Sequence, residues 1–142
     1  MNKIWTISRE TSELAVIREN IESILSELKM DPIYKSRMIL CIDEAAANII
    51  EHTPITGKPV EGFTIETAID NSSVTVTIID NGSKYDPTKE KDVDIKKHIR
   101  SGKKGGLGIF IMKSQLDIFE YKYENQCNVL TLGMNLKQDK LN

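Results

Sequence analysis

The sequence predicts an α+β fold, a two-layer sandwich in which three helices cover one face of a mixed, mostly antiparallel sheet. Apolar residues recur at spacings of three and four from Leu14 to Leu28 and again from Leu40 to Thr53, which indicates two amphipathic helices. Alternating segments rich in β-branched residues at 62–80 and 117–136 indicate two antiparallel hairpins. The resulting order of strand, two helices, hairpin, long loop, helix and hairpin is typical of such a sandwich.

Local signals set the limits of the predicted elements. Lys3 to Ser8 alternates weakly and predicts a short first strand. Asp31-Pro32 is a cap followed by proline at the first helical position, which starts the central helix, and Pro54 ends it near His52 or Thr53. Asn71-Ser72-Ser73 predicts the turn of the first hairpin.

The composition indicates one ordinary globular domain over residues 1–142, with 39% hydrophobic and 28% charged residues. A formal net charge of -2 gives no support for a nucleic-acid partner. No apolar run approaches the roughly 20 residues of a membrane span, and the N-terminus lacks a signal-peptide core, so we expect no membrane partner and a cytoplasmic location. Cys41 and Cys127 lack metal-ligand spacing and are expected to be reduced and structural.

Two polar residues interrupt the apolar central helix. Glu44 and Asn48 are four residues apart and therefore project from one face, one turn above the other. They are either a polar stripe on a solvated face, or a general base and an oxygen ligand for a hard cation.

Asp80-Asn81-Gly82 follows directly on a predicted strand. This signature is common at hairpin tips, but no alternating strand returns after it. As an alternative, the Asp80 carboxylate would accept a hydrogen bond from the exocyclic amino group of adenine, where guanine has a carbonyl. Gly82 would then let the backbone pass close to the base.

A glycine-rich segment, Gly105-Gly106-Leu107-Gly108, opens the last helix, which runs to about Gln115. It is either a flexible joint or an anion site, in which backbone amides and a helix N-terminus face a polyphosphate and Lys104 adds positive charge. No Lys-Ser or Lys-Thr pair follows the glycines, so it is not a Walker loop.

Taken together, EAAAN on a helix, IIDNG ending a strand and GGLGIFIM entering a helix resemble the three boxes of the GHKL ATP-binding superfamily. Within it, the chain is similar over nearly its whole length to the anti-sigma-factor serine/threonine-protein kinases (RsbW-like). The resemblance implies a Bergerat-type histidine-kinase-like ATPase domain with an ATP lid at about 83–104. Tyr85-Asp86-Pro87 stands where the family often has Phe-Asp-Pro.

The resemblance also implies the roles of the site residues. Glu44 maps to the general base, Asn48 to the Mg²⁺ ligand, Asp80 to the residue that binds the adenine amino group, and Gly82 lies beside the base. The phosphate-binding segment maps to Lys104, Gly105, Gly106, Leu107 and Gly108. The cofactors implied are ATP and Mg²⁺.

The function implied is an ATP-dependent serine/threonine-protein kinase that phosphorylates a STAS-domain, anti-anti-sigma-like partner. The alternative is a non-catalytic ATP-binding switch that sequesters a sigma factor or another regulator. A histidine-kinase catalytic domain is disfavoured, because neither His52 nor His98 lies in the setting of a phosphorylated histidine. The sequence names neither the partner nor the pathway. It leaves open whether the chain forms the homodimer that is common in the family.

Overall fold

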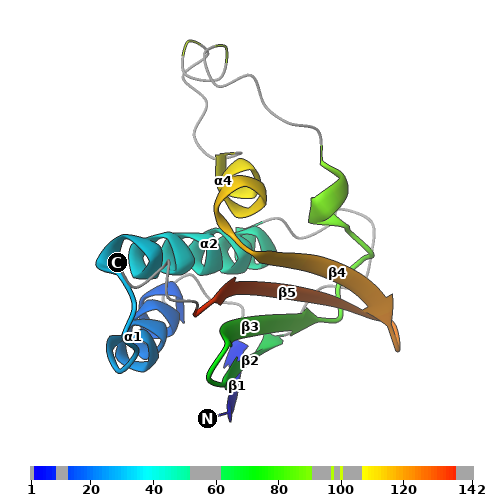
Figure 1. Ribbon diagram of the computed structural model, residues 1–142. Helices are drawn as coiled ribbons and strands as arrows, with labels where there is room; N and C mark the ends of the chain where they lie inside the picture. Colours follow the sequence, from blue (N-terminus) through cyan, green and yellow to red (C-terminus); the bar gives the residue numbers. More distant parts are fainter. Residues whose placement is uncertain are drawn as a thin grey trace.

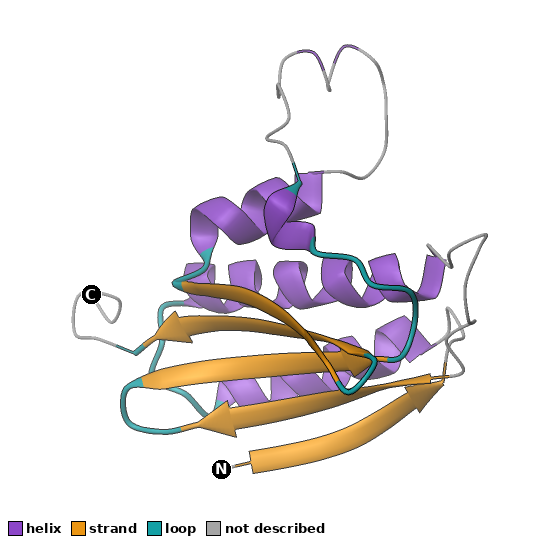
Figure 2. Ribbon diagram, turned by 90° about the vertical axis from the view of Figure 1, so that its right-hand side faces the viewer, coloured by secondary structure: helices purple, strands orange, loops and turns teal. Residues whose placement is uncertain are grey.

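The chain forms a five-stranded sheet with its helices on one face (Figures 1 and 2). The computed structural model describes residues 2–8, 13–51, 62–90, 97, 100 and 107–136. Within these ranges the strands are β1 (Asn2–Ser8), β2 (Gly62–Ile69), β3 (Ser73–Asp80), β4 (Ile118–Glu124) and β5 (Cys127–Asn135). The helices are α1 (Glu13–Ser26), α2 (Pro32–Glu51) and α4 (Leu107–Gln115), with a 3₁₀ turn, η1 (Pro87–Lys89). The predicted α+β sandwich with three helices is confirmed.

The sheet has the strand order β1-β2-β3-β5-β4, and each of its four pairings is antiparallel. The prediction of a mixed sheet is therefore wrong in this respect. The reason lies in the last hairpin, whose two-residue turn at Asn125 and Gln126 has left-handed φ angles of 52° and 61°. This turn sends β5 back along β4, and β5 then runs antiparallel to β3 as well.

The predicted start and turn signals act as expected. The Asp31 side chain accepts a hydrogen bond of 2.9 Å from the Ile33 amide and so caps α2, with Pro32 as its first residue. The Asp70 carboxylate accepts the amides of Ser72 and Ser73, at 2.7 and 2.9 Å, and closes the β2–β3 turn. The predicted end of the central helix at His52 or Thr53 falls outside the described residues.

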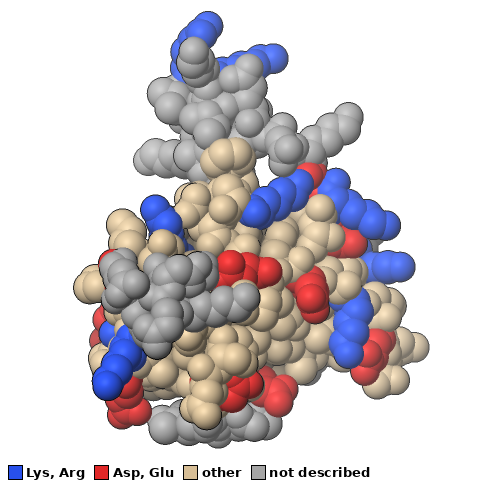
Figure 3. All heavy atoms as spheres, in the orientation of Figure 1, with Lys and Arg blue, Asp and Glu red and all other residues tan. Residues whose placement is uncertain are grey.

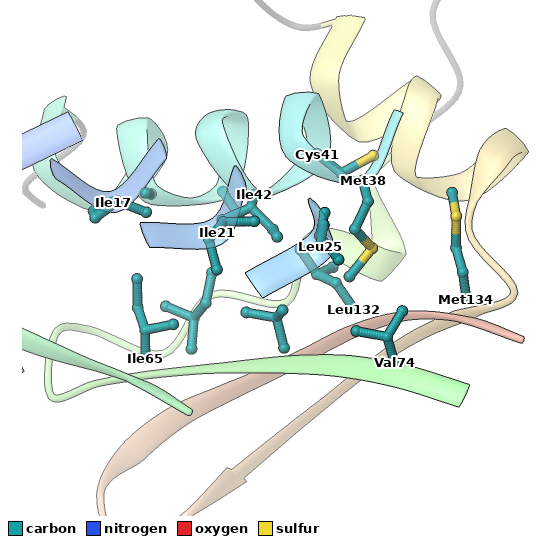
Figure 4. Close-up of a cluster of buried hydrophobic side chains, with 14 of the residues drawn as sticks. Ile17, Ile21, Leu25, Met38, Cys41, Ile42, Ile65, Val74, Leu132 and Met134 are labelled. Atoms are coloured by element: carbon teal, nitrogen blue, oxygen red, sulfur yellow. The ribbon is translucent and has the colours of Figure 1, made fainter. Parts of the chain in front are cut away.

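The core lies between the helices and one face of the sheet. Figure 4 shows side chains of α1 and α2 meeting those of the strands, namely Ile17, Ile21, Leu25, Met38, Cys41 and Ile42 against Ile65, Val74, Leu132 and Met134. Met112 adds α4 to this cluster, with 1% of its surface exposed. Burial of these apolar groups fixes α2 and α4 on the sheet, which positions the polar residues that they carry.

Side chains alternate across β3, and this alternation decides where Asp80 points. Val74, Val76 and Ile78 are buried beneath the helices, and Asp80 is the next residue of the same row. Helix α2 and strand β3 run in the same direction in Figure 1, so their carboxyl ends lie at the same end of the molecule. Asp80 therefore ends its strand on the helix-covered face, near the end of α2 that carries Glu44 and Asn48.

The start of the segment predicted as a lid contains a 3₁₀ turn. Residues 83–90 include η1, where the Asp86 side chain accepts from the Thr88 amide at 2.9 Å. The sequence did not predict this turn, because a single Asp-Pro pair gives too little periodicity to indicate it. The sequence also allows at most a short helix around 93–99 within this segment, and that range falls mainly outside the described residues. No described helix is long and apolar enough to cross a membrane.

Candidate functional site

The first part of the site is a direct contact between α2 and the N-terminus of α4. A Cβ atom built on Gly108 would lie 2.6 Å from Glu44 Cγ and 2.7 Å from both Glu44 Cβ and Oε2. Gly108 is buried and is the second residue of α4. Only glycine leaves room for Glu44 at this place, so two motifs that are 64 positions apart (108 − 44) in the sequence meet in space. A carboxylate at a helix N-terminus is in favourable electrostatic surroundings.

Asn48 lies one turn further along α2 and is partly buried, as is Glu44.

Cys41, three residues before Glu44, is fully buried in the core. Burial and, to a smaller extent, the Glu44 charge raise the pKa of the Cys41 thiol to about 12. The expectation of a structural thiol agrees with this, and among the described residues both cysteines are free.

Asp80 and Gly82 form the second part, at the end of β3. The Gly82 amide donates to Asp80 Oδ1 at 2.9 Å, so the chain turns sharply around the carboxylate. Gly82 is buried. The chain continues into η1 instead of returning as a strand, so the hairpin-tip alternative is wrong. Asn81 Oδ1 is buried and has no hydrogen-bond partner among the described residues.

Asn128 on β5 belongs to this part, and the sequence did not predict it. Its carboxamide nitrogen donates to Asp80 Oδ1 at 3.0 Å and to the Ser83 carbonyl at 2.9 Å. The sequence predicts a turn at 125–128 that includes Asn128, because asparagine is ordinary turn chemistry, whereas the structure places Asn128 in β5. The register that sets Asn128 opposite Asp80 joins residues 48 positions apart, and no local pattern contains it.

A third group of contacts holds residues 83–90, the start of the predicted lid, against α4. The Tyr85 hydroxyl donates to Glu90 Oε1 at 2.7 Å, and Lys113 Nζ of α4 donates to the Glu90 carbonyl.

The charged residues are interspersed on the face shown in Figure 3, with Lys and Arg beside Asp and Glu.

The remaining predicted residues are placed only in part. Leu107 is the first residue of α4, whereas Lys104, Gly105 and Gly106 lie outside the described residues. The structure therefore brings Glu44 and Gly108 together and joins Asp80 to Gly82. Within the described ranges, no group of three His, Cys, Asp or Glu side chains could hold a metal by itself.

These motif residues are the ones expected of a nucleotide site, and comparison with known proteins decides the family. Residues 7–134 match the model of the histidine kinase-like ATPase domain. The chain belongs to this family. The histidine kinase-like domain is also 30% identical over 95 residues to the serine/threonine-protein kinase BtrW of Bordetella bronchiseptica. The aligned residues make up 67% of this chain and 66% of BtrW.

The fold is similar to a crystal structure of the RsbU and RsbW domains of Rv1364c from Mycobacterium tuberculosis. The TM-score is 0.65, with 13% identity, over 94% of this chain and 32% of that chain. The chain thus spans a little under two thirds of BtrW and about one third of the mycobacterial chain. The predicted likeness to the GHKL superfamily and to RsbW-like proteins is confirmed, and membership of an ATPase family supports ATP as the nucleotide.

Proposed function

We propose that this histidine kinase-like domain binds ATP with Mg²⁺ and transfers the γ-phosphoryl group to a serine or threonine of a STAS-domain, anti-anti-sigma-like protein. The observation that carries the proposal is the contact of Glu44 with Gly108. It sets a carboxylate directly against the end of a helix that is suited to bind phosphate. A base and a phosphate site in contact are what phosphoryl transfer to a hydroxyl needs.

In this proposal, one end of the site binds the base and the other binds the phosphates. Asp80 accepts the adenine amino group, and Gly82 leaves room for the base. The phosphates lie on the backbone amides at the start of α4, in the segment Lys104, Gly105, Gly106, Leu107 and Gly108. Support comes from the fold, since α2 and β3 end on the same side and α4 lies over α2 (Figures 1 and 2).

The chemical role of Glu44 is that of a general base. The carboxylate accepts the proton of the acceptor hydroxyl as its oxygen forms a bond to the γ-phosphorus. The bond from that phosphorus to the bridging oxygen breaks, and ADP leaves with the electron pair. Removing such a base lowers the rate by about 10²–10⁴-fold.

Asn48 would hold the magnesium ion. Mg²⁺ keeps several waters and needs one or two protein ligands besides the substrate phosphates, and a carboxamide oxygen suits it. The described residues contain no group of three His, Cys, Asp or Glu side chains that could hold the ion, so the nucleotide phosphates would supply most of its non-protein ligands. When bound, the ion offsets charge on the phosphates.

A protein partner is supported by the relatives rather than by the geometry, and the STAS class rests on the resemblance to the anti-sigma-factor kinases. BtrW is named a serine/threonine-protein kinase, and the mycobacterial chain joins an RsbW domain to an RsbU domain. A sigma factor would be a second partner that the domain sequesters. This fits the partner switching implied by the likeness to anti-sigma-factor kinases.

The test is transfer of ³²P from γ-labelled ATP to a purified STAS-domain protein of the same cell. Glu44→Gln should lose transfer by about 10²-fold or more while binding ATP in calorimetry as the wild type does. Asp43→Asn is the matched control, because Asp43 is the adjacent acidic residue and is paired with Arg18, 2.8 Å from Arg18 Nε. Equal transfer by Glu44→Gln and wild type would refute the role of the base. ATP binding without transfer by the wild type would instead favour the non-catalytic switch.

A further inference from the structure

Asn128 is a buried polar residue beside the proposed base-binding end of the site. It is the second residue of β5 and lies opposite Asp80 in the β3–β5 register. Its exposed fraction is 6%, and among the described residues Thr67 is the other buried polar residue. A buried carboxamide is costly unless its hydrogen-bonding groups have partners.

The Asn128 carboxamide has a partner for each of its groups. Its nitrogen donates to Asp80 Oδ1 at 3.0 Å and to the Ser83 carbonyl at 2.9 Å. Its oxygen accepts the Tyr85 amide at 3.0 Å and the Tyr121 hydroxyl at 2.5 Å. Two N–H groups and two lone pairs are all that a carboxamide offers, so its capacity is filled.

The orientation of this carboxamide is fixed by its surroundings. The Tyr85 amide can only donate and the Ser83 carbonyl can only accept, so exchanging the oxygen and nitrogen of Asn128 would oppose like groups. Burial raises the pKa of the Tyr121 phenol, which therefore stays protonated and donates. The amino group of Asn128 consequently always faces Asp80.

The consequence for Asp80 is that its two oxygens differ. Oδ1 accepts from both the Gly82 amide, at 2.9 Å, and Asn128, at 3.0 Å. Among the described residues, Oδ2 has no hydrogen-bond partner. Oδ1 is thus occupied by the protein, and Oδ2 is left for a donor outside it.

We propose that Asn128 is a positioning residue that holds Asp80 with Oδ2 toward the exocyclic amino group of the base, and so sets the preference for adenine nucleotides. This rests on the proposed function, in which Asp80 binds adenine. Without Asn128 the carboxylate would still be present but could rotate about its side-chain bonds. It would then no longer offer one fixed oxygen to the amino group.

The experiment compares the affinity for ATP with that for purine riboside triphosphate, which lacks only the 6-amino group. In the wild type we expect ATP to bind about 10- to 100-fold tighter, as for a hydrogen bond to a charged group. Tyr121→Phe is the control, because it removes the hydroxyl but leaves the Asn128 amino group on Asp80. Tyr121→Phe with Asn128→Leu removes the carboxamide without leaving a buried hydroxyl unpaired.

The ratio of the two affinities is the readout. Partial unfolding lowers both affinities by the same factor and leaves the ratio unchanged, whereas loss of a positioned Asp80 lowers the ratio alone. We expect Tyr121→Phe to keep the ratio and the double variant to bring it to within about threefold of one. A double variant that keeps the wild-type ratio would overturn the role of Asn128 and leave the proposed function standing. A wild type that binds both nucleotides equally would overturn the adenine site itself.

A second measurement covers the case in which the double variant does not fold. In ¹⁵N-labelled wild type, the side-chain amide signal of Asn128 should shift on adding ATP and shift less on adding purine riboside triphosphate. Equal shifts with the two nucleotides at saturation would overturn the inference.

Discussion

Gly108→Ala should destabilise the protein, although alanine is normally the better residue in a helix. The added Cβ would lie 2.6 Å from Glu44 Cγ and 2.7 Å from Glu44 Cβ. Carbon atoms in contact prefer about 3.5–4.0 Å, so the fit is short by about 1 Å. Rotation of the Glu44 side chain cannot relieve this, because its Cβ is fixed by the α2 backbone. The two helices have to move apart.

Two opposing terms set the magnitude. Alanine in place of glycine would by itself stabilise a helix by up to about 1 kcal/mol. Overpacking of a closely packed contact costs about 1–3 kcal/mol. Because Glu44 Cβ cannot move away, the cost lies in the upper part of this range, about 2–3 kcal/mol, and the expected net change is a loss of about 1–2 kcal/mol in the free energy of unfolding. The sign of the change in the free energy of unfolding is the decisive result, because without the contact the same substitution would stabilise the protein.

The assay is urea unfolding followed by far-UV circular dichroism, with the midpoint compared at constant m value. Ser114→Ala, at an exposed position of the same helix, is the control and should stabilise the fold by a few tenths of a kcal/mol. In a double-mutant cycle, Glu44→Gly should remove most of the cost of Gly108→Ala, since it deletes all three clashing atoms. If Gly108→Ala is as stable as the wild type, or more so, Glu44 does not lie against α4. The observation that carries the proposed function is then lost.

Three further predictions concern other parts of the chain. At pH 8 the buried Cys41, whose pKa of about 12 leaves little thiolate, should react with a thiol reagent about 10³-fold more slowly than a small free thiol does. Mass spectrometry of Cys127→Ser checks this, since this variant should stay unlabelled. Amides of Ser72 and Ser73, with the Ser72 hydroxyl, lower the pKa of Asp70, so this carboxylate stabilises the fold above its unfolded pKa of about 3.9. The wild type should therefore have a higher Tm than Asp70→Asn at neutral pH, and this difference in Tm should vanish as the pH falls through the lowered pKa of Asp70. A difference in Tm that does not change with pH would contradict this. Gln126→Gly should raise the free energy of unfolding by about 0.5–1 kcal/mol, measured as a higher urea midpoint, because it relieves a φ of 61° in the turn; a lower midpoint would argue against this turn geometry.

The helices and strands of this fold, unlike η1, could be predicted from sequence because each has a local cause. The caps at Asp31 and Asp70 are examples, since a side chain bonds to a backbone amide two residues on. The role of Asp80 as a site residue could also be proposed from the sequence, because the absence of a returning strand argued against a hairpin tip. The resemblance of three motifs supplied the other candidate residues of the site, but it did not predict the contact of Glu44 with Gly108, which follows from the packing of α4 on α2.

What the sequence could not provide is the register between distant strands. Asn128 lies within the turn predicted at 125–128, and its burial depends on which residue of β3 lies opposite it. The antiparallel direction of β5 beside β3 is of the same kind, because the chain passes through η1, α4 and β4 between them. Such facts are properties of packing and not of any local window.

The two ends of the proposed site are therefore secured by different physical means. Glu44 and Gly108 are held by the close approach of two helices whose other faces are buried in the core. Asp80 and Asn128 are held by a strand register in which a slip of one residue would move Asn128 to the opposite face. The turn at Asn125 and Gln126, immediately before β5, helps to set that register. Because no hydrogen bond between described residues joins the two pairs directly, phosphate binding and base discrimination can be perturbed one at a time. A defect in one is not evidence against the other.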